Sequence, residues 1–291
     1  MLNALTVDVE DYFHVQAFAD VILPNNWSQY PLRVDNNTRR LLEMFGRRDI
    51  RATFFILGWV AEHCPALVRE IASAGHEIGC HGYHHQLIGR ADEKVFREDI
   101  HHAKAVLEEL SGASIKCYRA PSYSVTTRTL WALDILHDAG FEYDSSIFPV
   151  VHDQYGIPDA PRFLHYRSLG NGRRILEFPP STISMLGANL PISGGGYFRL
   201  LPYDITAWAL RRINEKEAQP VMFYLHPWEI DPAQPRIAAC WRSRVRHYQN
   251  LHSTEEKLAR LLEEYSWAPL TEVVKATLSK CVPIDEVANG L

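Results

Sequence analysis

The stretch ALTVDVED, residues 4–11, decides the fold class, because it is a short apolar strand that runs directly into acids. A second apolar run, ATFFIL at residues 52–57, is β-branched and aromatic and has no alternating polar positions. Runs of this kind are typical of strands that are buried on both faces in a parallel sheet. The two runs therefore indicate that parallel strands form the centre of the protein.

Strands and helices alternate through the first half of the chain. Further segments that read as strands are residues 76–79, 116–119 and 141–144. The segments with helical periodicity are residues 36–47, 65–73, 92–110 and 127–139. This alternation predicts an α/β fold with a parallel sheet.

The second half of the chain is less regular. Residues 148–203 are rich in Pro, Gly and aromatic residues, with one strand candidate at residues 175–178. A connection of this length in a compact domain is usually a functional loop. After it, PVMFYL at residues 220–225 reads as a buried strand, and residues 204–215 and 255–264 have helical periodicity.

The composition excludes several classes of protein. With 291 residues, 46% of them hydrophobic, the chain can bury one large core. No apolar stretch is long enough for a membrane-spanning helix, and residues 1–8 have no signal-peptide pattern, so we expect a cytoplasmic protein. The net charge is -5 and the basic residues are scattered, which argues against a nucleic-acid partner.

The cysteines also argue for a reducing compartment. Their number is odd, and no pair has CxxC spacing, which speaks against a disulfide framework or a thiolate zinc site. The five are Cys64, Cys80, Cys117, Cys240 and Cys281.

Ionisable side chains follow four of the predicted strands. Asp8, Glu10 and Asp11 stand at the end of the first strand, and His81 and His85 follow the strand at residues 76–79. Arg119 ends the strand at residues 116–119, and His226 follows the strand at residues 220–225. Because the carboxyl ends of the strands converge in α/β barrels, we expect these side chains to meet at one site.

The acids and histidines suit a metal site. His81 and His85 have the spacing that places two imidazoles on one face of a helical turn, and two histidines with one carboxylate leave open positions for water and substrate. Asp8 and Glu10 point to the same face of their strand, so one can bind a metal while the other acts as a general base. The alternatives are a hydrated histidine-rich loop and acids that cap the next segment or pair with basic groups.

Arg119 and His226 each allow two interpretations. An arginine at a strand end can hold a carboxylate through its bidentate fork, although an ordinary salt bridge is the commoner use. A histidine at the end of an apolar strand is usually a core residue with its hydrogen bonds satisfied, but it can also serve as a general acid near neutral pH.

Taken in order, these segments resemble the motifs of the NodB-homology deacetylases, carbohydrate esterase family 4. TVDVED at residues 6–11 resembles the family's TFDDG, and HGYHH at residues 81–85 resembles its H(S/T)xxH. RAPSY at residues 119–123 looks like RxPY, and the dipeptide at residues 225–226 looks like LxH. The resemblance covers residues 4–230. It implies a distorted (β/α) barrel of seven or eight parallel strands and the hydrolytic removal of acetyl groups from N-acetylated sugars.

The resemblance also implies roles for single residues. Asp8 matches the catalytic base, His81 and His85 the metal ligands, Arg119 the residue that positions the base, and His226 the general acid. A backbone N–H near Ser122 would stabilise the oxyanion, and Ser122 and Tyr123 would contact the substrate. The metal would be divalent, with Zn²⁺ as the default and Co²⁺, Ni²⁺ or Mn²⁺ as alternatives.

The chain departs from the family pattern in three places. Val9 replaces the usual second aspartate, so Glu10 is expected to bind the metal, with Asp11 as the fallback. Gly82 replaces the usual Ser or Thr. The acid that orients the acidic histidine is not evident, and Asp144 is our candidate for it.

The loop at residues 194–198, with Gly195, and the indole of Trp228 are candidates for a sugar platform, although aromatic residues in a loop often only pack it down.

Longer phrases resemble one branch of the family, the deacetylases encoded with bacterial exopolysaccharide and exosortase loci. They are VDVEDYFHV, YDSSIFP, GGGYFR and FYLHPWEID. This resemblance implies an exopolysaccharide or its precursor as substrate and the exopolysaccharide assembly machinery as a partner. It also implies a catalytic domain at residues 1–230 and a C-terminal extension at residues 231–291 that packs on the barrel and ends in a mobile tail.

Two other functions are compatible with the sequence. One is a related C–N hydrolase of a small amide, similar to an allantoinase. The other is a catalytically inactive glycan-binding relative, which the departure at Val9 favours and the retained base, histidines and arginine oppose. The oligomeric state is left open.

Overall fold

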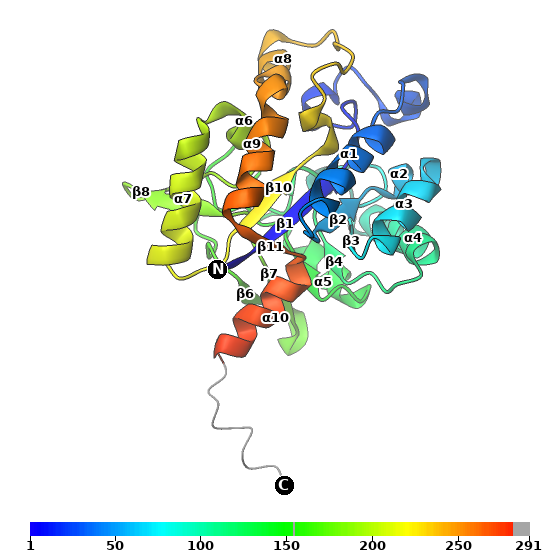
Figure 1. Cartoon of the computed structure of the whole chain (residues 1–291). Coiled ribbons are helices and arrows are strands. Elements are labelled where there is room, and N and C mark those ends of the chain that lie inside the picture. Colours follow the sequence, from blue (N-terminus) through cyan, green and yellow to red (C-terminus); the bar gives the residue numbers. More distant parts are fainter. Residues whose placement is uncertain (154, 282–291) are drawn as a thin grey trace.

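A computed structural model describes residues 1–153 and 155–281 of the chain (Figure 1). The tail that we predicted after Lys280 lies, from residue 282 onward, outside the described residues. In the part that is described, no helix combines the length and the hydropathy needed to cross a membrane. The cysteine side chains that are described, Cys64, Cys80, Cys117 and Cys240, are free thiols.

A mainly parallel sheet forms the centre of the molecule and confirms the predicted α/β class. Within the described residues the sheet has nine strands, and β6 (His165–Ser168) is antiparallel to its neighbour. The parallel strands, in spatial order, are β10 (Met222–Leu225), β1 (Leu2–Val9), β2 (Thr53–Ile56), β3 (Glu77–Cys80), β4 (Cys117–Tyr118), β5 (Tyr143–Asp144) and β7 (Arg174–Glu177). β11 (Ser266–Ala268) pairs in parallel with the start of β1.

The irregular segment that follows β7 runs beside β10. The Ser181 N–H donates to the carbonyl of Met222, and the Tyr224 N–H donates to the carbonyl of Ser193 at 2.9 Å. Gly194 forms a bridge to Tyr224 with φ of 142°, and a Cβ there would lie 1.9 Å from the Tyr224 carbonyl oxygen. Only glycine allows this approach, which explains the glycine at position 194.

Helices cover the outside of the sheet. In Figure 1 the helices up to α5 lie on one side of β1 and β10, and α7 and α9 lie on the other. The longer helices are α1 (Val34–Gly46), α3 (Pro65–Ser73), α4 (Glu93–Ser111), α5 (Trp131–Asp138), α7 (Tyr203–Lys216), α8 (Trp241–Tyr248), α9 (Leu251–Glu264) and α10 (Leu270–Cys281). The short ones are α2 (Gly58–His63) and α6 (Gly195–Leu200).

The helix ends follow the local chemistry. α4 begins where the Asp92 carboxylate accepts from the Val95 N–H at 2.8 Å, and it ends at Gly112 with φ of 68°. α5 starts at Trp131, later than predicted, because the Thr129 hydroxyl accepts from the Thr126 N–H at 2.8 Å and forms a turn there.

The two faces of β1 have different environments. Leu5, Val7 and Val9 belong to the large apolar cluster between the sheet and the helices. Ala4 faces the smaller cluster inside the barrel, which also contains Phe55, Met222 and side chains of α10. Because side chains alternate along a strand, Thr6 and Asp8 also point inward, above this inner cluster.

The part of the chain after residue 231 does more than pack on the outside of the barrel. β11 is a strand of the central sheet, and Leu270, Val273 and Val274 join the inner cluster. α8 and α9 lie next to each other in Figure 1 and lead from β10 to β11.

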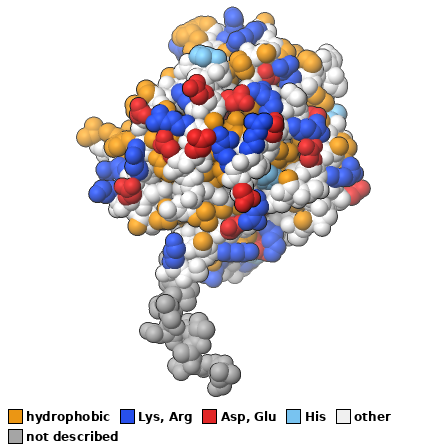
Figure 2. All heavy atoms as spheres, viewed as in Figure 1, with side chains coloured by type: hydrophobic (Ala, Val, Ile, Leu, Met, Phe, Trp, Pro, Cys, Tyr) orange, Lys and Arg blue, Asp and Glu red, His pale blue; other side chains and the backbone are white. Residues whose placement is uncertain are grey.

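A hairpin projects from the barrel on the left of Figure 1. It consists of β8 (Thr182–Met185) and β9 (Ala188–Pro191). The hairpin carries the exposed hydrophobic side chains Met185, Leu186 and Leu190, and Figure 2 shows orange spheres at the left edge, where the hairpin projects.

Candidate metal centre and active site

Three buried side chains form a group that can hold a metal ion. Each of Glu10, His81 and His85 offers one ligand atom, and these atoms all lie within 4.8 Å of one another. Glu10 follows β1, His81 follows β3, and His85 lies in the loop after β3. The predicted convergence of strand ends thus brings the proposed carboxylate together with both histidines.

The loop that carries the two histidines is not the helical turn that we predicted. Gly82 and His85 both have positive φ, 73° and 52°, so the backbone curls in the left-handed sense. The Asp99 carboxylate on α4 holds the loop by accepting from the Tyr83 N–H at 2.7 Å. A Cβ on Gly82 would lie 3.1 Å from that carboxylate, which is a physical reason for glycine at this position.

The protonation states suit a metal ligand set. His81 donates its Nδ1–H to the carbonyl of Arg119 at 2.8 Å, which leaves Nε2 as the ligand atom. Burial lowers the pKa of His81 to about 4, so the ring is neutral at pH 7. Burial alone would raise the pKa of Glu10, but the nearby histidines, above all His85, hold it well below its usual range.

The second oxygen of Glu10 is the observation that fits a cation. Oε1 accepts from Trp228 Nε1 at 3.2 Å. Oε2 is buried and lies 2.7 Å from His85 Nε2, so two prospective ligand atoms face each other. Two imidazole nitrogens and one carboxylate oxygen are a common ligand set for Zn²⁺ and similar divalent metals.

Asp11 does not join this group. Its carboxylate accepts from the backbone N–H groups of Tyr12, Arg33 and Val34 at 2.6–2.9 Å. Arg33 and Val34 are the first residues of the turn that begins α1, so Asp11 fixes the start of that helix. The structure therefore leaves Glu10, and not the fallback Asp11, as the carboxylate next to the histidines.

Arg119 holds Asp8 inside the barrel. Its Nη1 donates to Asp8 Oδ1 at 2.6 Å and to the Thr6 hydroxyl at 2.8 Å. Nη2 and Nε donate to the hydroxyl and the carbonyl of Ser145. The contact with Asp8 is through one nitrogen and not the predicted bidentate fork, because the other donors bind Ser145.

His226 lies beside both acids of β1. Its Nε2 is 3.5 Å from Glu10 Oε1 and 3.9 Å from Asp8 Oδ2, and its Nδ1 is 2.6 Å from Glu229 Oε1. Burial disfavours the charged ring, but Glu10, Glu229 and Asp8 together raise the pKa of His226 to about 9. The ring therefore carries a proton near neutral pH, as a general acid requires.

The prediction that Asp144 orients His226 is wrong. Asp144 is paired with Glu177 on the neighbouring strand and accepts from the Ser146 hydroxyl at 2.5 Å. The residue that holds His226 is Glu229, whose Oε1 also accepts the His226 N–H at 3.0 Å. The acid three residues after His226 in HPWE was a signal in the sequence that could have identified it.

Asp144 instead supports the residue after Arg119, through Ser146. The carboxyls of Asp144 and Glu177 are both fully buried, and burial raises the pKa of each, so the pair binds a proton more tightly than ordinary carboxyls do. Ser146, which donates to Asp144, accepts from the Ala120 N–H at 2.8 Å.

Trp228 is not an open sugar platform. Its side chain is buried, and its ring stacks on His226 with centroids 5.1 Å apart and on His247 with centroids 4.2 Å apart. Together with its hydrogen bond to Glu10, this placement makes it a support of the metal group.

The other predicted substrate contacts are also partly enclosed. Gly195 is buried, and a Cβ there would lie 2.8 Å from the Tyr224 hydroxyl, so its role is close packing. Tyr123 is buried between Phe148 and Tyr224. Ser122 is partly exposed, and both Ser122 and Tyr123 have φ of 52°, a backbone strain that is common at functional sites.

Family models match two adjacent parts of the chain. Residues 27–143 match the polysaccharide deacetylase family, and residues 145–275 match a domain of unknown function, DUF3473. His81, His85 and Arg119 lie in the first match, and His226 and Glu229 lie in the second. The candidate site is thus composed of residues from both parts and from the strand before them.

Curated relatives resemble a little over a third of the chain. A peptidoglycan-N-acetylglucosamine deacetylase of Bacillus cereus is 32% identical over 117 residues, which are 38% of this chain and 42% of that protein. A peptidoglycan deacetylase of Helicobacter pylori is 30% identical over 112 residues, 37% of this chain and 36% of that protein. The matches span less than half the length of these relatives.

Solved structures resemble almost the whole fold. One is described as a polysaccharide deacetylase from Mycobacterium smegmatis, with a TM-score of 0.61, 22% identity, and coverage of 97% of this chain and 91% of that one. Another is Puue allantoinase, with a TM-score of 0.59 and 15% identity. The match covers 94% of this chain and 88% of that one. At these identities the likeness establishes the fold alone, and it confirms the predicted distorted (β/α) barrel.

Proposed function

Because the chain carries a polysaccharide deacetylase domain of the NodB-homology family, followed by DUF3473, we propose that it removes acetyl groups from N-acetylated sugars in a metal-dependent hydrolysis. The observation that supports this most is the position of His226. Its Nε2 lies 3.9 Å from Asp8 and 3.5 Å from Glu10, so an acid and a base flank the Glu10, His81 and His85 group.

The proposed chemistry assigns one task to each residue. A divalent metal held by Glu10, His81 and His85 would polarise the acetamide carbonyl and lower the pKa of a bound water. Asp8, with Oδ1 held by Arg119, takes the proton of the attacking water on Oδ2. The N–H groups of Tyr123 and Ser124 already donate to backbone carbonyls, so the N–H of Ser122 itself, in the turn after β4, is the donor that we propose for the developing oxyanion.

Departure of the amine needs a second proton transfer. His226 is held through Nδ1 by Glu229 and donates the proton on Nε2 to the leaving nitrogen. The carbon–nitrogen bond breaks, and the products are acetate and a free amino sugar. Asp8 then returns its proton to solvent, and His226 takes one up.

The finer parts of the proposal come from the sequence resemblance. We propose Zn²⁺ as the metal, an exopolysaccharide or its precursor as the substrate, the exopolysaccharide assembly machinery as a partner and the cytoplasm as the location. We also propose a catalytic domain at residues 1–230 with a C-terminal extension from residue 231. A panel of N-acetylated oligosaccharides and metal reconstitution with Zn²⁺, Co²⁺, Ni²⁺ and Mn²⁺ would test substrate and metal.

Hydrolysis of a small cyclic amide is the second candidate. The likeness to Puue allantoinase, with a TM-score of 0.59, favours keeping it, because the same barrel accommodates that reaction class. Assays of allantoin alongside the oligosaccharides would separate the two candidates.

The first experiment measures metal content and acetate release together. We expect roughly one metal per chain in the wild type, and loss of both metal and acetate release from N-acetylglucosamine oligomers in His81→Ala/His85→Ala. The matched control is His84→Ala/His101→Ala, since His84 and His101 are exposed. Metal without acetate release would redirect the proposal to another amide, and no metal under metal-replete conditions would support the glycan-binding alternative.

A further inference from the structure

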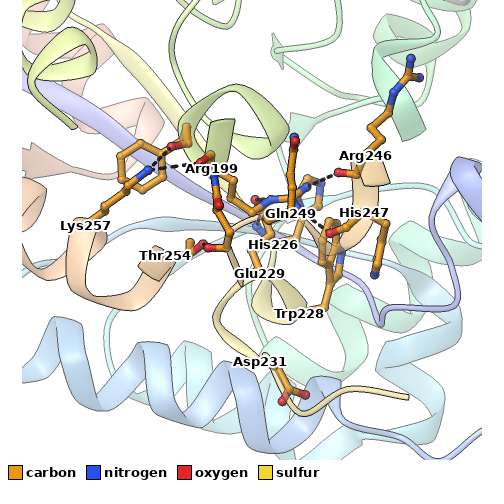
Figure 3. A network of polar contacts seen from close by, with 12 residues as sticks. Arg199, His226, Trp228, Glu229, Asp231, Arg246, His247, Gln249, Thr254 and Lys257 are labelled. Atoms are coloured by element: carbon orange, nitrogen blue, oxygen red, sulfur yellow. Dashed lines mark hydrogen bonds and ion pairs between the residues drawn. The ribbon is translucent and has the colours of Figure 1, made fainter. Parts of the chain in front are cut away.

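Arg199 is a buried cation that the proposed mechanism leaves without a task. It lies on the short helix α6, three residues after Gly196, and only 2% of its surface is exposed. Figure 3 shows its guanidinium between Glu229 and the segment that contains Arg246, His247 and Gln249. Burying an arginine is costly unless its donors are all used, so its contacts are informative.

One edge of the guanidinium holds the carboxylate next to the general acid. Arg199 Nε donates to Glu229 Oε2 at 2.7 Å, while Glu229 Oε1 accepts from His226 Nδ1 at 2.6 Å. The two oxygens of one buried carboxylate thus have separate partners, and rotation of the carboxylate is restricted. The face of the guanidinium lies 5.0 Å from the ring centre of Trp228, which itself stacks on His226.

The other edge binds the end of α8. Nη1 donates to the carbonyls of His247 and Gln249 at 2.5 and 3.2 Å, and Nη2 donates to the carbonyl of Arg246 at 3.3 Å. The last carbonyls of a helix have no partner within the helix, so a cation there satisfies them and favours the helix dipole. Arg199 therefore joins the C-terminal end of α8 to Glu229.

The backbone of Arg199 is also fixed by the C-terminal part of the chain. Its carbonyl accepts from Asn250 Nδ2 at 2.9 Å and from Lys257 Nζ at 3.2 Å. Asn250 precedes α9 and Lys257 lies within it. Both the side chain and the backbone of this arginine are thus held by residues 246–257.

We propose that Arg199 is a positioning residue for the general acid, and that residues 246–257 of the DUF3473 region serve to fix it. Through Glu229 it orients His226 Nε2 toward the leaving nitrogen. This inference rests on the proposed deacetylation. It assigns to the C-terminal region a role in catalysis, because that region holds Arg199 and so orients the general acid.

The test compares two substrates that differ in their need for an acid. An amine leaves only when it is protonated, whereas the 4-nitrophenolate of 4-nitrophenyl acetate leaves without a proton. In Arg199→Lys, which keeps the charge but loses the fork, we expect kcat for N-acetylglucosamine oligomers to fall about 10- to 100-fold, the size seen when supporting partners are removed. Hydrolysis of 4-nitrophenyl acetate and metal content are expected to stay near wild type.

Arg162→Lys is the matched control. Arg162 also binds a carboxylate, Glu217, and a carbonyl, that of Thr182, but it lies at the base of the β8–β9 hairpin. Its variant is expected to keep the amide-to-ester ratio of the wild type. Glu229→Gln is expected to lower this ratio as Arg199→Lys does, and the double variant to lower it no further, because the two residues act in series.

Equal losses on both substrates in Arg199→Lys would overturn the inference, since they would indicate a general effect on folding. An unchanged ratio would overturn it as well. If Arg199→Lys does not fold, Asn250→Gly removes only the hydrogen bond to the Arg199 carbonyl at a position with φ of 53°, and the ratio must fall there too. If the wild type releases acetate from neither substrate, the proposed function itself is refuted. An active wild type with an unchanged ratio in Arg199→Lys would refute only the inference about Arg199.

Discussion

The guanidinium of Arg119 lies 2.6 Å from Asp8 Oδ1, and both side chains are buried inside the barrel. One oxygen of Asp8 is thus occupied, and the other faces His226. This arrangement fixes the orientation of the carboxylate and leaves Oδ2 on the side of His226.

Asp8→Asn tests the role of this carboxylate. The amide keeps the shape but cannot accept a proton, so we expect kcat for acetate release to fall by about 10²- to 10⁴-fold. Metal content and the melting temperature are the internal controls and should remain close to those of the wild type. Full activity in this variant would exclude Asp8 as the base.

Arg119→Met tests the ion pair itself. Removing the cation leaves Asp8 buried without its nearest counter-charge, and we expect the free energy of unfolding to fall by about 3–5 kcal/mol. Arg47→Met is the control, because Arg47 and Glu43 form an exposed pair at the C-terminal end of α1, and a change below about 1 kcal/mol is expected. Urea unfolding measures both, and similar losses in the two variants would contradict the prediction.

Trp228→Phe tests the support of Glu10. It keeps an aromatic ring between His226 and His247 but removes the Nε1–H that donates to Glu10. We expect metal affinity to fall about 10- to 100-fold, measured by competition with a chelator. Trp241→Phe, at an exposed position on α8, should leave the affinity unchanged.

His76 predicts a pH dependence of stability away from the metal group. Burial lowers the pKa of this histidine in the folded state to about 4, from 6.5, and its Nδ1 accepts from the Ala52 N–H at 3.1 Å. The unfolded chain therefore binds the proton first, and the stability due to the neutral ring is lost as pH falls from 6.5 toward 4.

His76→Asn isolates this contribution, since Asn Oδ1 can accept the same hydrogen bond without titrating. Between pH 7 and pH 4 we expect the wild type to lose about 3 kcal/mol more stability than the variant. The free energy of unfolding in urea, measured against pH, checks this. If it changes with pH by the same amount in both proteins, the pKa of His76 is not lowered in the folded state.

The Asp144–Glu177 pair predicts the opposite dependence. Burial raises the pKa of both carboxyls, so the folded state keeps a proton that the unfolded chain releases, and stability falls as pH rises above the usual carboxyl range. In Glu177→Gln the amide can donate to Asp144 without that proton while its oxygen accepts from the Ile147 N–H. We expect the variant to gain stability relative to the wild type as pH rises from 5 to 9, and a constant difference across this range would count against a shared proton.

The sequence predicted the framework well for a physical reason. Hydrophobic periodicity and strand-end chemistry are local properties, so β1, β2 and α3 could be identified from segments of a few residues. The two-residue strands β4 and β5 and the hairpin of β8 and β9 lie in segments with weak periodicity, and the hairpin was missed.

Within the site, the sequence by itself determined which residues stand at the carboxyl ends of parallel strands, and Asp8, His81, Arg119 and His226 meet there because such ends converge. Only the tertiary structure decided which acidic residue contacts each of these side chains. Glu229 holds His226, Asp144 pairs with Glu177, and Asp11 begins α1. These choices depend on the packing of segments that are far apart in the chain, such as α6 against the end of α8, and no local pattern encodes those distances.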